Sequence, residues 1–227
     1  MRSASFVAVA AFCGATAACG GSTGSPVASS PLGASHAVSG VVVESGGGPL
    51  PGVVVTATSS GLSATTGASG AYQLAAPGPT SIDLAKAGYE PMTYGQFPLT
   101  RDTTVNGVLQ PMLRMATAAH LTATIFPDDN VYPVSGGAAL TLCGPCKVIH
   151  VDASGATDVV IDVRWGSAAP LTLWGFGRSI SGTSPIRVVA RAAAGDNRLY
   201  VGVAVGLSAA PSSPISVDLT TAVVASS

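Results

Sequence analysis

The chain has 227 residues, of which 47% are hydrophobic and only 9% are charged, and its formal net charge is -1. This balance supplies no basic field for a nucleic-acid backbone and no polybasic patch for anionic lipid headgroups, so nucleic acid is excluded as an expected partner. The 28 glycines and 16 prolines favour many short strands over long amphipathic helices, and the length suits two small domains. We therefore expect an all-β protein with two small antiparallel β-sandwiches.

Residues 1–18 have the pattern of a signal peptide for export. A positive charge near the start is followed by residues 4–18, which contain no acid or base and are too few for a stable membrane-spanning helix. The small residues before Cys19 resemble the lipobox of bacterial lipoproteins, although Thr16 stands where leucine is usual. The resemblance implies a lipid on Cys19 and a place in the cell envelope, at the outer membrane of a Gram-negative cell because Gly20 follows. Cleavage at an ordinary signal-peptide site nearby is the alternative.

Residues 19–37 are rich in Gly, Ser and Ala and carry no charge, which predicts a flexible tether. Residues 20–24 match the Gly-x-Ser-x-Gly pattern of a nucleophile elbow around Ser22. That motif works only between a strand and a helix, and neither is predicted here. We interpret the match as chance in a low-complexity segment.

The first domain is predicted over residues 38–113. Val53, Val55 and Ala57 alternate with more polar neighbours, which places one face of a strand on a core. Ile82 and Leu84 repeat the pattern, while Pro-Gly at 51–52 and the Gly-Ala-Ser-Gly segment at 67–70 have the composition of turns. Tyr72 is predicted to be a core or corner tyrosine.

Four segments of this domain resemble the carboxypeptidase regulatory-like domain. They are Gly-Val-Val-Val at 40–43, Pro-Leu-Pro-Gly-Val at 49–53, Thr-Thr-Gly-Ala-Ser-Gly-Ala-Tyr at 65–72 and Lys-Ala-Gly-Tyr at 86–89. The resemblance implies a transthyretin-like Greek-key sandwich, classed with carbohydrate-binding-like folds, that acts as a binding or spacer module without catalysis. Ser69 stands where the family commonly has aspartate, which weakens any expectation of a bound cation.

Aromatic residues follow in a segment punctuated by proline. Tyr89, Tyr94 and Phe97 are candidates for stacking on a sugar ring or for contact with a partner protein. The alternative is that these rings close one end of the sandwich. We name Tyr89 and Tyr94 as candidate ligand-binding residues.

The second domain is predicted over residues 116–223, where four segments alternate with period two and one buried face. The inward residues are Val159, Ile161, Val163 and Trp165; Ile186, Val188 and Ala190; Leu199, Val201, Val203 and Val205; Ile215, Val217 and Leu219. The opposite face carries Asp158, Asp162, Arg164, Arg187, Arg191, Tyr200, Ala204, Ser216 and Asp218. Residues 147–220 are similar to the bacterial pre-peptidase C-terminal sandwich, which implies a second accessory module.

Trp174 and Phe176 are the candidate ligand surface of this domain. Period two places Leu171 and Leu173 on one strand face and Thr172, Trp174 and Phe176 on the other. If the leucines form the core, the two rings offer a flat apolar platform for a sugar or a partner. The alternative is a central strand that is covered on both faces.

Cys143 and Cys146 enclose Gly-Pro, which gives the tetrapeptide of the thioredoxin active site. That site needs a helix N-terminus to activate the first thiol, whereas residues 147–151 are rich in β-branched side chains. Gly-Pro instead fits the centre of a type II′ hairpin turn that sets the cysteines face to face. Once Cys13 leaves with the signal peptide and Cys19 is lipidated, no other thiols remain in the exported chain. We expect a structural disulfide, with thiol redox chemistry as the alternative.

Metal sites are further alternatives. The same two cysteines with His150 give three zinc ligands, and Asp152 or His120 could supply a fourth. Residues 128–130, Asp-Asp-Asn, could help to hold a calcium ion, but they equally suit an ordinary turn. The three histidines of the chain assemble no triad or acid/base pair, so we expect no catalytic residue and no cofactor.

Together these patterns predict an exported, lipid-anchored, non-catalytic module for binding or display, with carbohydrate among its possible ligand classes. The expected partner is an envelope glycan or a protein of the envelope or cell surface. An envelope redox or zinc protein that uses Cys143 and Cys146 is one alternative, and a mechanical spacer or scaffold is the other.

Overall fold

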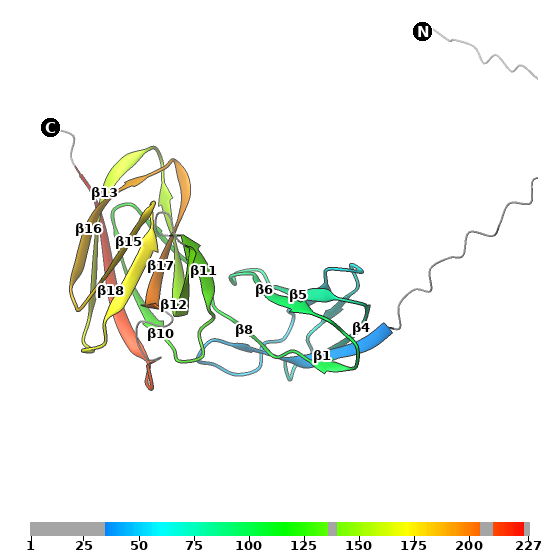
Figure 1. Ribbon diagram of the computed structural model, residues 1–227. Coiled ribbons are helices and arrows are strands. Elements are labelled where there is room, and N and C mark those ends of the chain that lie inside the picture. Colours follow the sequence, from blue (N-terminus) through cyan, green and yellow to red (C-terminus); the bar gives the residue numbers. More distant parts are fainter. Residues whose placement is uncertain (1–34, 136–139, 205–210, 225–227) are drawn as a thin grey trace, which may run out of the picture. The chain divides into compact units, whose positions relative to one another are not determined.

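The computed structural model describes residues 35–135, 140–204 and 211–224, which all lie within one structural unit of the chain (Figure 1). These ranges are built from β-strands, which confirms the predicted all-β class. No helix in them has the length and hydropathy needed to cross a membrane. The predicted signal peptide, Cys19 and nearly all of the predicted tether lie outside the described residues.

Two four-stranded sheets form the first sandwich. In one sheet, β1 pairs antiparallel with β4 and parallel with β7 and β8. The other sheet is antiparallel, in the order β3-β2-β5-β6. The bounds are β1 Ser35–Glu44, β2 Val54–Ala57, β3 Ser63–Thr65, β4 Ala71–Pro77, β5 Thr80–Ala85, β6 Met92–Phe97, β7 Thr103–Thr104 and β8 Gly107–Leu109.

Alternating side chains build the core of the first sandwich, as the sequence predicts. Val53, Val55 and Ala57 are each 0% exposed, whereas Val54 between them is 43% exposed. Tyr72 is buried, and its hydroxyl donates a 2.7 Å hydrogen bond to the carbonyl of Val105, which confirms the predicted corner role. One apolar cluster therefore holds both sheets together.

Gly70 shows why one predicted turn needs glycine. Its φ is +72°, and a Cβ there would lie 2.3 Å from the carbonyl oxygen of Val42. The backbone of Val42 hydrogen-bonds Gly70 at 2.9 Å, so the turn packs directly on β1. Any side chain at this position would separate the turn from the strand.

A four-stranded and a six-stranded sheet form the second sandwich. The first has the antiparallel order β10-β18-β13-β16, and the second has the order β11-β12-β17-β14-β15, with β9 parallel to β12. The bounds are β9 Leu113–Ala116, β10 Ala119–Ile125, β11 Tyr132–Ser135, β12 Leu140–Ala153, β13 Thr157–Trp165, β14 Leu171–Gly175, β15 Arg178–Gly182, β16 Ile186–Ala192, β17 Gly195–Ala204 and β18 Ile215–Val223. Because β9 pairs here, Leu113 joins the second sandwich rather than the predicted first domain.

The predicted inward faces of the second sandwich share one core. The inward residues of β13, β16, β17 and β18 all lie in or against a single apolar cluster, apart from Val205, which lies outside the described residues. The prediction of only one buried face is wrong for the six-stranded sheet. A second cluster covers its other face, with the members Tyr132, Val134, Cys143, Cys146, Val148, Trp174 and Ala204. We call this set the outer cluster.

Candidate functional site

Trp174 does not form an exposed platform, so that prediction is wrong. Its side chain is only 2% exposed and packs in the outer cluster. Leu171 and Leu173 do lie on the opposite face, in the main core, as period two predicts. The strand β14 pairs with β17 on one side and β15 on the other, and apolar side chains cover both of its faces.

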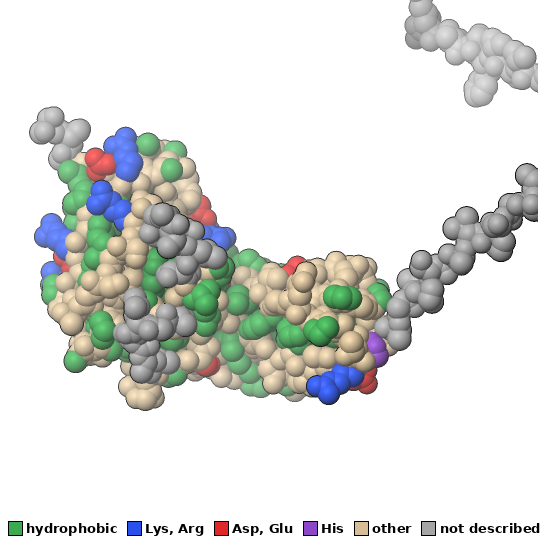
Figure 2. Space-filling view, in the orientation of Figure 1, with side chains coloured by type: hydrophobic (Ala, Val, Ile, Leu, Met, Phe, Trp, Pro, Cys, Tyr) green, Lys and Arg blue, Asp and Glu red, His purple; other side chains and the backbone are tan. Residues whose placement is uncertain are grey.

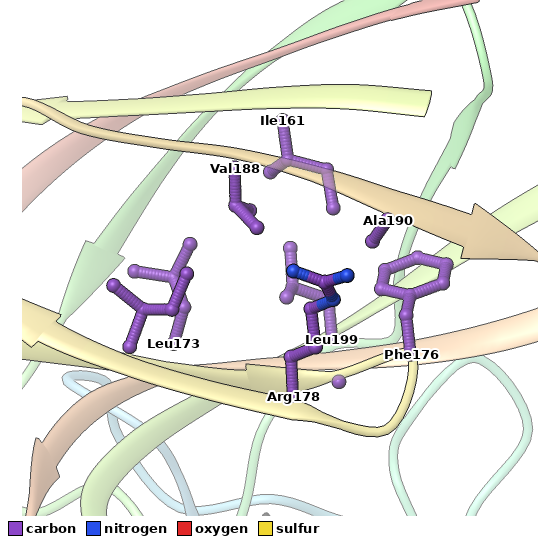
Figure 3. A pocket seen from close by; sticks show the side chains of 9 residues that line it. Ile161, Leu173, Phe176, Arg178, Val188, Ala190 and Leu199 are labelled. Carbon is purple, nitrogen blue, oxygen red and sulfur yellow. The ribbon is translucent and has the colours of Figure 1, made fainter. Parts of the chain in front are cut away.

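Phe176 lies apart from Trp174, beside a small apolar slot between the two sheets. Figure 3 shows its ring next to Ala190 and the guanidinium of Arg178 among Leu173, Val188 and Leu199. The free space in this slot is about 10 Å³, which is roughly the room that one water molecule needs. The slot therefore has no room for a sugar ring, and the predicted pairing of Phe176 with Trp174 is also wrong.

Tyr89 and Tyr94 are partly buried, and their hydroxyls bond within the protein. The Tyr89 hydroxyl donates to Glu44 at 3.0 Å, and Lys86 lies 5.1 Å from the centre of its ring. The Tyr94 hydroxyl accepts from the backbone N–H of Val108 at 2.9 Å and lies 3.1 Å from Oδ1 of Asn130. A role for either ring in ligand binding stays a prediction.

The predicted disulfide between Cys143 and Cys146 is present. The predicted hairpin turn around it is wrong, because the cysteines lie within β12, where a bulge interrupts the pairing with β17. Both cysteines are 0% exposed. A thiol-exchange enzyme needs an accessible sulfur, so this buried crosslink does not suit the redox alternative.

The zinc alternative does not fit these side chains either. The cysteines bond to each other, and both ring nitrogens of His150 face carboxylates, of Glu90 and Asp196. No cluster of metal-binding side chains is found among the described residues. The Asp-Asp-Asn segment at 128–130 does not fit the calcium alternative either, because Asp129 and Asn130 are buried and hydrogen-bonded to other parts of the protein.

Polar residues instead gather where the two sandwiches meet, in a set that sequence reasoning missed. Lys147 on β12 lies 2.6 Å from Oδ1 of Asp129 and 2.9 Å from the hydroxyl of Ser45, which comes from the first sandwich. Ser45 also donates to Asp129. The Lys147 and Asp129 side chains are 5% and 0% exposed, so this is a buried ion pair bridged by a hydroxyl.

Two opposing effects act on the pKa of Asp129 in this ion pair. Burial raises the pKa of the Asp129 carboxyl, while the Lys147 ammonium, Ser45 and the backbone N–H of Phe126 counter that shift. The Phe126 ring also lies 5.1 Å from the ammonium of Lys147. Removing one partner of such a pair leaves a buried charge uncompensated, which typically costs about 3–5 kcal/mol.

A second polar group at the junction is centred on His150 of β12. Its Nδ1 lies 2.7 Å from a carboxylate oxygen of Asp196, and its Nε2 contacts Glu90 from the first sandwich. On the same sheet, Arg114 makes hydrogen bonds of 3.0 and 2.6 Å to Asp152, which lowers the pKa of that carboxyl.

Residues 110–112 connect the two sandwiches, and hydrogen bonds hold this segment in place. Gln110 is 0% exposed and its amide donates to the Tyr132 hydroxyl at 2.6 Å, while its Oε1 has no partner among the described residues. Its carbonyl accepts from the N–H of Glu90 at 2.9 Å, and the N–H of Met112 donates to Gly88 at 2.8 Å. The connection is therefore held in place by hydrogen bonds to both sandwiches.

Apolar contacts complete this junction. Met92 on β6 packs against both the core of the first sandwich and the outer cluster of the second. Gly46 has φ +65°, and a Cβ there would lie 2.4 Å from the Phe126 ring. The ring thus packs directly on the backbone of the first sandwich, beside a mixed pocket of about 350 Å³ that Lys147 helps to line.

One sequence signal pointed to the junction. Lys147 and His150 interrupt an otherwise apolar run in β12, and a polar side chain in a buried strand needs a partner. The partners themselves come from distant turns, at positions 45, 90 and 129, that no local pattern connects to β12.

The exposed surface carries few charges. On the face seen in Figure 2, acidic and basic side chains are scattered among hydrophobic and neutral polar atoms. On the outer face of β13 and β16, Arg191 lies 3.2 Å from Asp158, and Arg164 lies 3.1 Å from Asp162. Such exposed pairs contribute little to stability, and they leave no extended single-sign patch on the outer face of these two strands.

Comparison with known families confirms the resemblance predicted for the first sandwich. Residues 37–110 match the model of the carboxypeptidase regulatory-like domain, which covers about a third of the 227-residue chain. No curated protein sequence matches the chain.

Several solved structures share features of this fold. The pre-peptidase C-terminal domain of collagenase from Bacillus anthracis is 13% identical, with 49% of this chain and 94% of that domain covered and a TM-score of 0.31. A major pilin subunit of Bacillus cereus is 9% identical; the match covers 82% of this chain and 59% of the pilin, with a TM-score of 0.28. The Bacillus anthracis TIE protein is 10% identical; the match covers 80% of this chain and 31% of the TIE protein, with a TM-score of 0.29. The chain thus spans less than two thirds of the pilin and about a third of the TIE protein, and TM-scores this low carry no functional inference.

Proposed function

We propose that this chain is a non-catalytic display module of the bacterial cell envelope. It is exported, anchored by a lipid on Cys19, and presents two joined β-sandwiches at the end of a charge-free tether. Its partner is an envelope glycan or a surface protein. In a Gram-negative cell, its place is the outer membrane.

The junction between the sandwiches is the observation that carries this proposal. Domains that only need to be near each other are usually joined by exposed, flexible linkers with small polar interfaces. Here the linker is hydrogen-bonded, Lys147 and Asp129 form a buried ion pair that also bonds Ser45 of the first sandwich, and buried Glu90 contacts His150. Buried ionic contacts contribute little net stability but fix one arrangement, because any other leaves charges unpaired. A protein that displays a surface at a set distance and orientation benefits from such a joint.

The matched family agrees with a role without catalysis, since it is a regulatory-like domain. The same joint equally favours a mechanical spacer, which is the second candidate. The two differ in whether the chain has a partner. A glycan array and a pull-down from solubilised envelopes, both with the purified chain, distinguish them: specific capture supports display, and no capture supports a spacer.

Anchoring is tested by labelling cells with an alkynyl fatty acid. The wild-type chain should be labelled and sediment with membranes, because the proposal places the lipid on Cys19. Cys19→Ser should be unlabelled and released from membranes. Cys13→Ser is the matched control, since the proposal removes Cys13 with the signal peptide, and it should behave like the wild type. An unlabelled wild-type chain would contradict the proposed anchor.

A further inference from the structure

The first and last strands of the first sandwich lie side by side and run in the same direction (Figure 1). β1 pairs parallel with β7 and then with β8, from Val38 opposite Thr103 to Glu44 opposite Leu109. Each partner lies 65 residues further along the chain, so the register is constant over the whole contact. We call this contact between β1 and residues 102–109 the parallel seam.

Hydrogen bonds continue the parallel seam beyond the paired residues at both ends. Before the first pair, the N–H of Ala37 donates to Oδ1 of Asp102 at 2.8 Å. After the last pair, the N–H of Ser45 donates to the carbonyl of Leu109 at 2.9 Å. The seam therefore follows β1 from Ala37 to the end of the strand.

The middle of the parallel seam, between β7 and β8, is also closed. The N–H of Val41 donates to Oδ1 of Asn106 at 3.0 Å, and the N–H of Val105 donates to the carbonyl of Ser39 at 2.8 Å. A Cβ on residue 40 would collide with the carbonyl of Val105, so glycine at that position lets the two segments approach. An asparagine side chain thus takes the place of a backbone acceptor where the ladder is interrupted.

The chain enters and leaves the first sandwich at opposite ends of this seam. Ser35 begins β1, while Leu109 ends β8 and is followed by the connection to the second sandwich. Leu109 lies beside Glu44, so the line from Ser35 to Leu109 follows the axis of β1 for about 30 Å. Tension between these two points would slide β1 along β7 and β8. All hydrogen bonds of the seam would then carry the load together, and none could break ahead of the others.

We propose that the first sandwich resists tension between the anchored end of the chain and the second sandwich, and that the parallel seam is the element that resists it. This inference rests on the proposed display role, because a chain held at Cys19 and bound to a partner through its second sandwich is stretched whenever the partner moves. Forced unfolding is governed by the rate of unfolding, which depends on how the load meets the bonds. A seam loaded along its axis gives the slow rate that such a role requires.

The other side of β1 provides an internal comparison. There β1 pairs antiparallel with β4, and Ser35 lies opposite Pro77. Tension applied between these neighbouring ends would act across the ladder and open it one pair at a time. The same strand should therefore resist load strongly in one direction and weakly in the other.

The test is single-molecule force spectroscopy on residues 19–227 with Cys19→Ser and Pro79→Cys, which places one free thiol at an exposed position beside the end of β4. Handles at the two chain ends load the parallel seam, and handles at the N-terminus and residue 79 load the antiparallel ladder. The length released identifies the sandwich that opens, because an extended chain gains about 3.3–3.6 Å per residue and residues 35–109 are fewer than residues 113–223. The first sandwich should open at a several-fold higher force when pulled by its chain ends.

Two matched variants locate the resistance in the seam. Asn106→Ala removes the acceptor for Val41 and should lower the opening force between the chain ends, while leaving the force across the antiparallel ladder unchanged. Thr93→Ala is the control, because it also removes an exposed hydrogen bond, of 2.7 Å to Asp83, but on the opposite sheet. It should leave both forces unchanged. Urea unfolding of the two variants checks that their equilibrium stabilities fall by similar amounts.

Equal opening forces in the two pulling directions would overturn the proposal, as would equal effects of Asn106→Ala and Thr93→Ala on the force between the chain ends. The comparison of directions decides the question even if a variant fails to fold. Because the force is measured on the purified chain, its outcome is independent of the fatty-acid labelling that tests the anchor. A failed anchor and a failed seam are therefore distinguishable.

Discussion

The two sandwiches differ in how many of their sheet faces are covered. The first has one apolar cluster between its sheets, and the alternate residues of its strands point to water. The second has a core of the same kind, but its six-stranded sheet carries the outer cluster as well. Period-two alternation thus identifies the side chains that share a face, but whether the second face is covered depends on tertiary packing.

Substitution of Trp174 should have the largest effect, and it tests whether the outer cluster covers the second face of the six-stranded sheet. Trp174→Ala should destabilise the protein by about 3–5 kcal/mol, because it empties a large, fully buried site. Denaturant unfolding measures this loss. Leu142→Ala on the same sheet is the control, since Leu142 is 45% exposed and its loss should cost little. A nearly unchanged Trp174→Ala midpoint would mean that the outer face is open after all.

Lys147 tests the buried ion pair of the second sandwich to which Ser45 of the first sandwich is hydrogen-bonded. Lys147→Met should cost about 3–5 kcal/mol, since it leaves Asp129 buried without its cation. The double variant with Asp129→Leu should recover much of that loss, because both charges are then removed. Unfolding of both single variants and the double variant completes the cycle. Strictly additive effects would show that the two residues are not coupled.

A buried tyrosine in each sandwich allows a direct comparison at alkaline pH. Burial raises the pKa of both Tyr72 and Tyr132 to about 12. An unfolded tyrosine ionises near 10, so between about pH 10 and 12 the folded state retains a proton that the unfolded state loses. The contribution of these two tyrosines to the free energy of unfolding should therefore be constant below about pH 10 and fall by about 1.4 kcal/mol per pH unit for each tyrosine between about pH 10 and 12.

The variants Tyr72→Phe and Tyr132→Phe separate these two contributions. Each should unfold more easily near neutral pH, by about 1 kcal/mol for the lost hydrogen bond, yet show a shallower decline at alkaline pH. Urea unfolding at several pH values measures both effects. An alkaline decline that neither substitution changes would contradict the burial of these hydroxyls.

The disulfide should have the smallest effect, although only the second sandwich has one. The loop between Cys143 and Cys146 is very short, so its stabilisation should lie at or below the low end of the usual ~2–4 kcal/mol. A reducing agent should leave the melting temperature nearly unchanged in native conditions, because both sulfurs are buried. Turnover in an insulin-reduction assay, or stoichiometric zinc in the purified protein, would contradict a structural role.

Sequence alone predicted most of the fold and little of the site. Alternation located the core strands around Val55, Ile161 and Val217, and the disulfide followed from two isolated cysteines. Trp174 was misplaced because its burial depends on β11, β12 and β17, whose positions no local pattern gives. The junction was missed for the same reason: Ser45 and Asp129 are 84 residues apart along the chain, and they meet only after both sandwiches have formed.

Differential scanning calorimetry of the purified chain tests the central claim that the junction makes one unit of two sandwiches. The wild type should unfold in a single transition whose calorimetric and van't Hoff enthalpies agree, because Ser45 of the first sandwich hydrogen-bonds the buried Lys147–Asp129 pair of the second, and Glu90 of the first contacts His150 of the second. Lys147→Met should split it into two transitions. Two independent transitions in the wild type, unchanged by Lys147→Met, would show that the two sandwiches unfold separately.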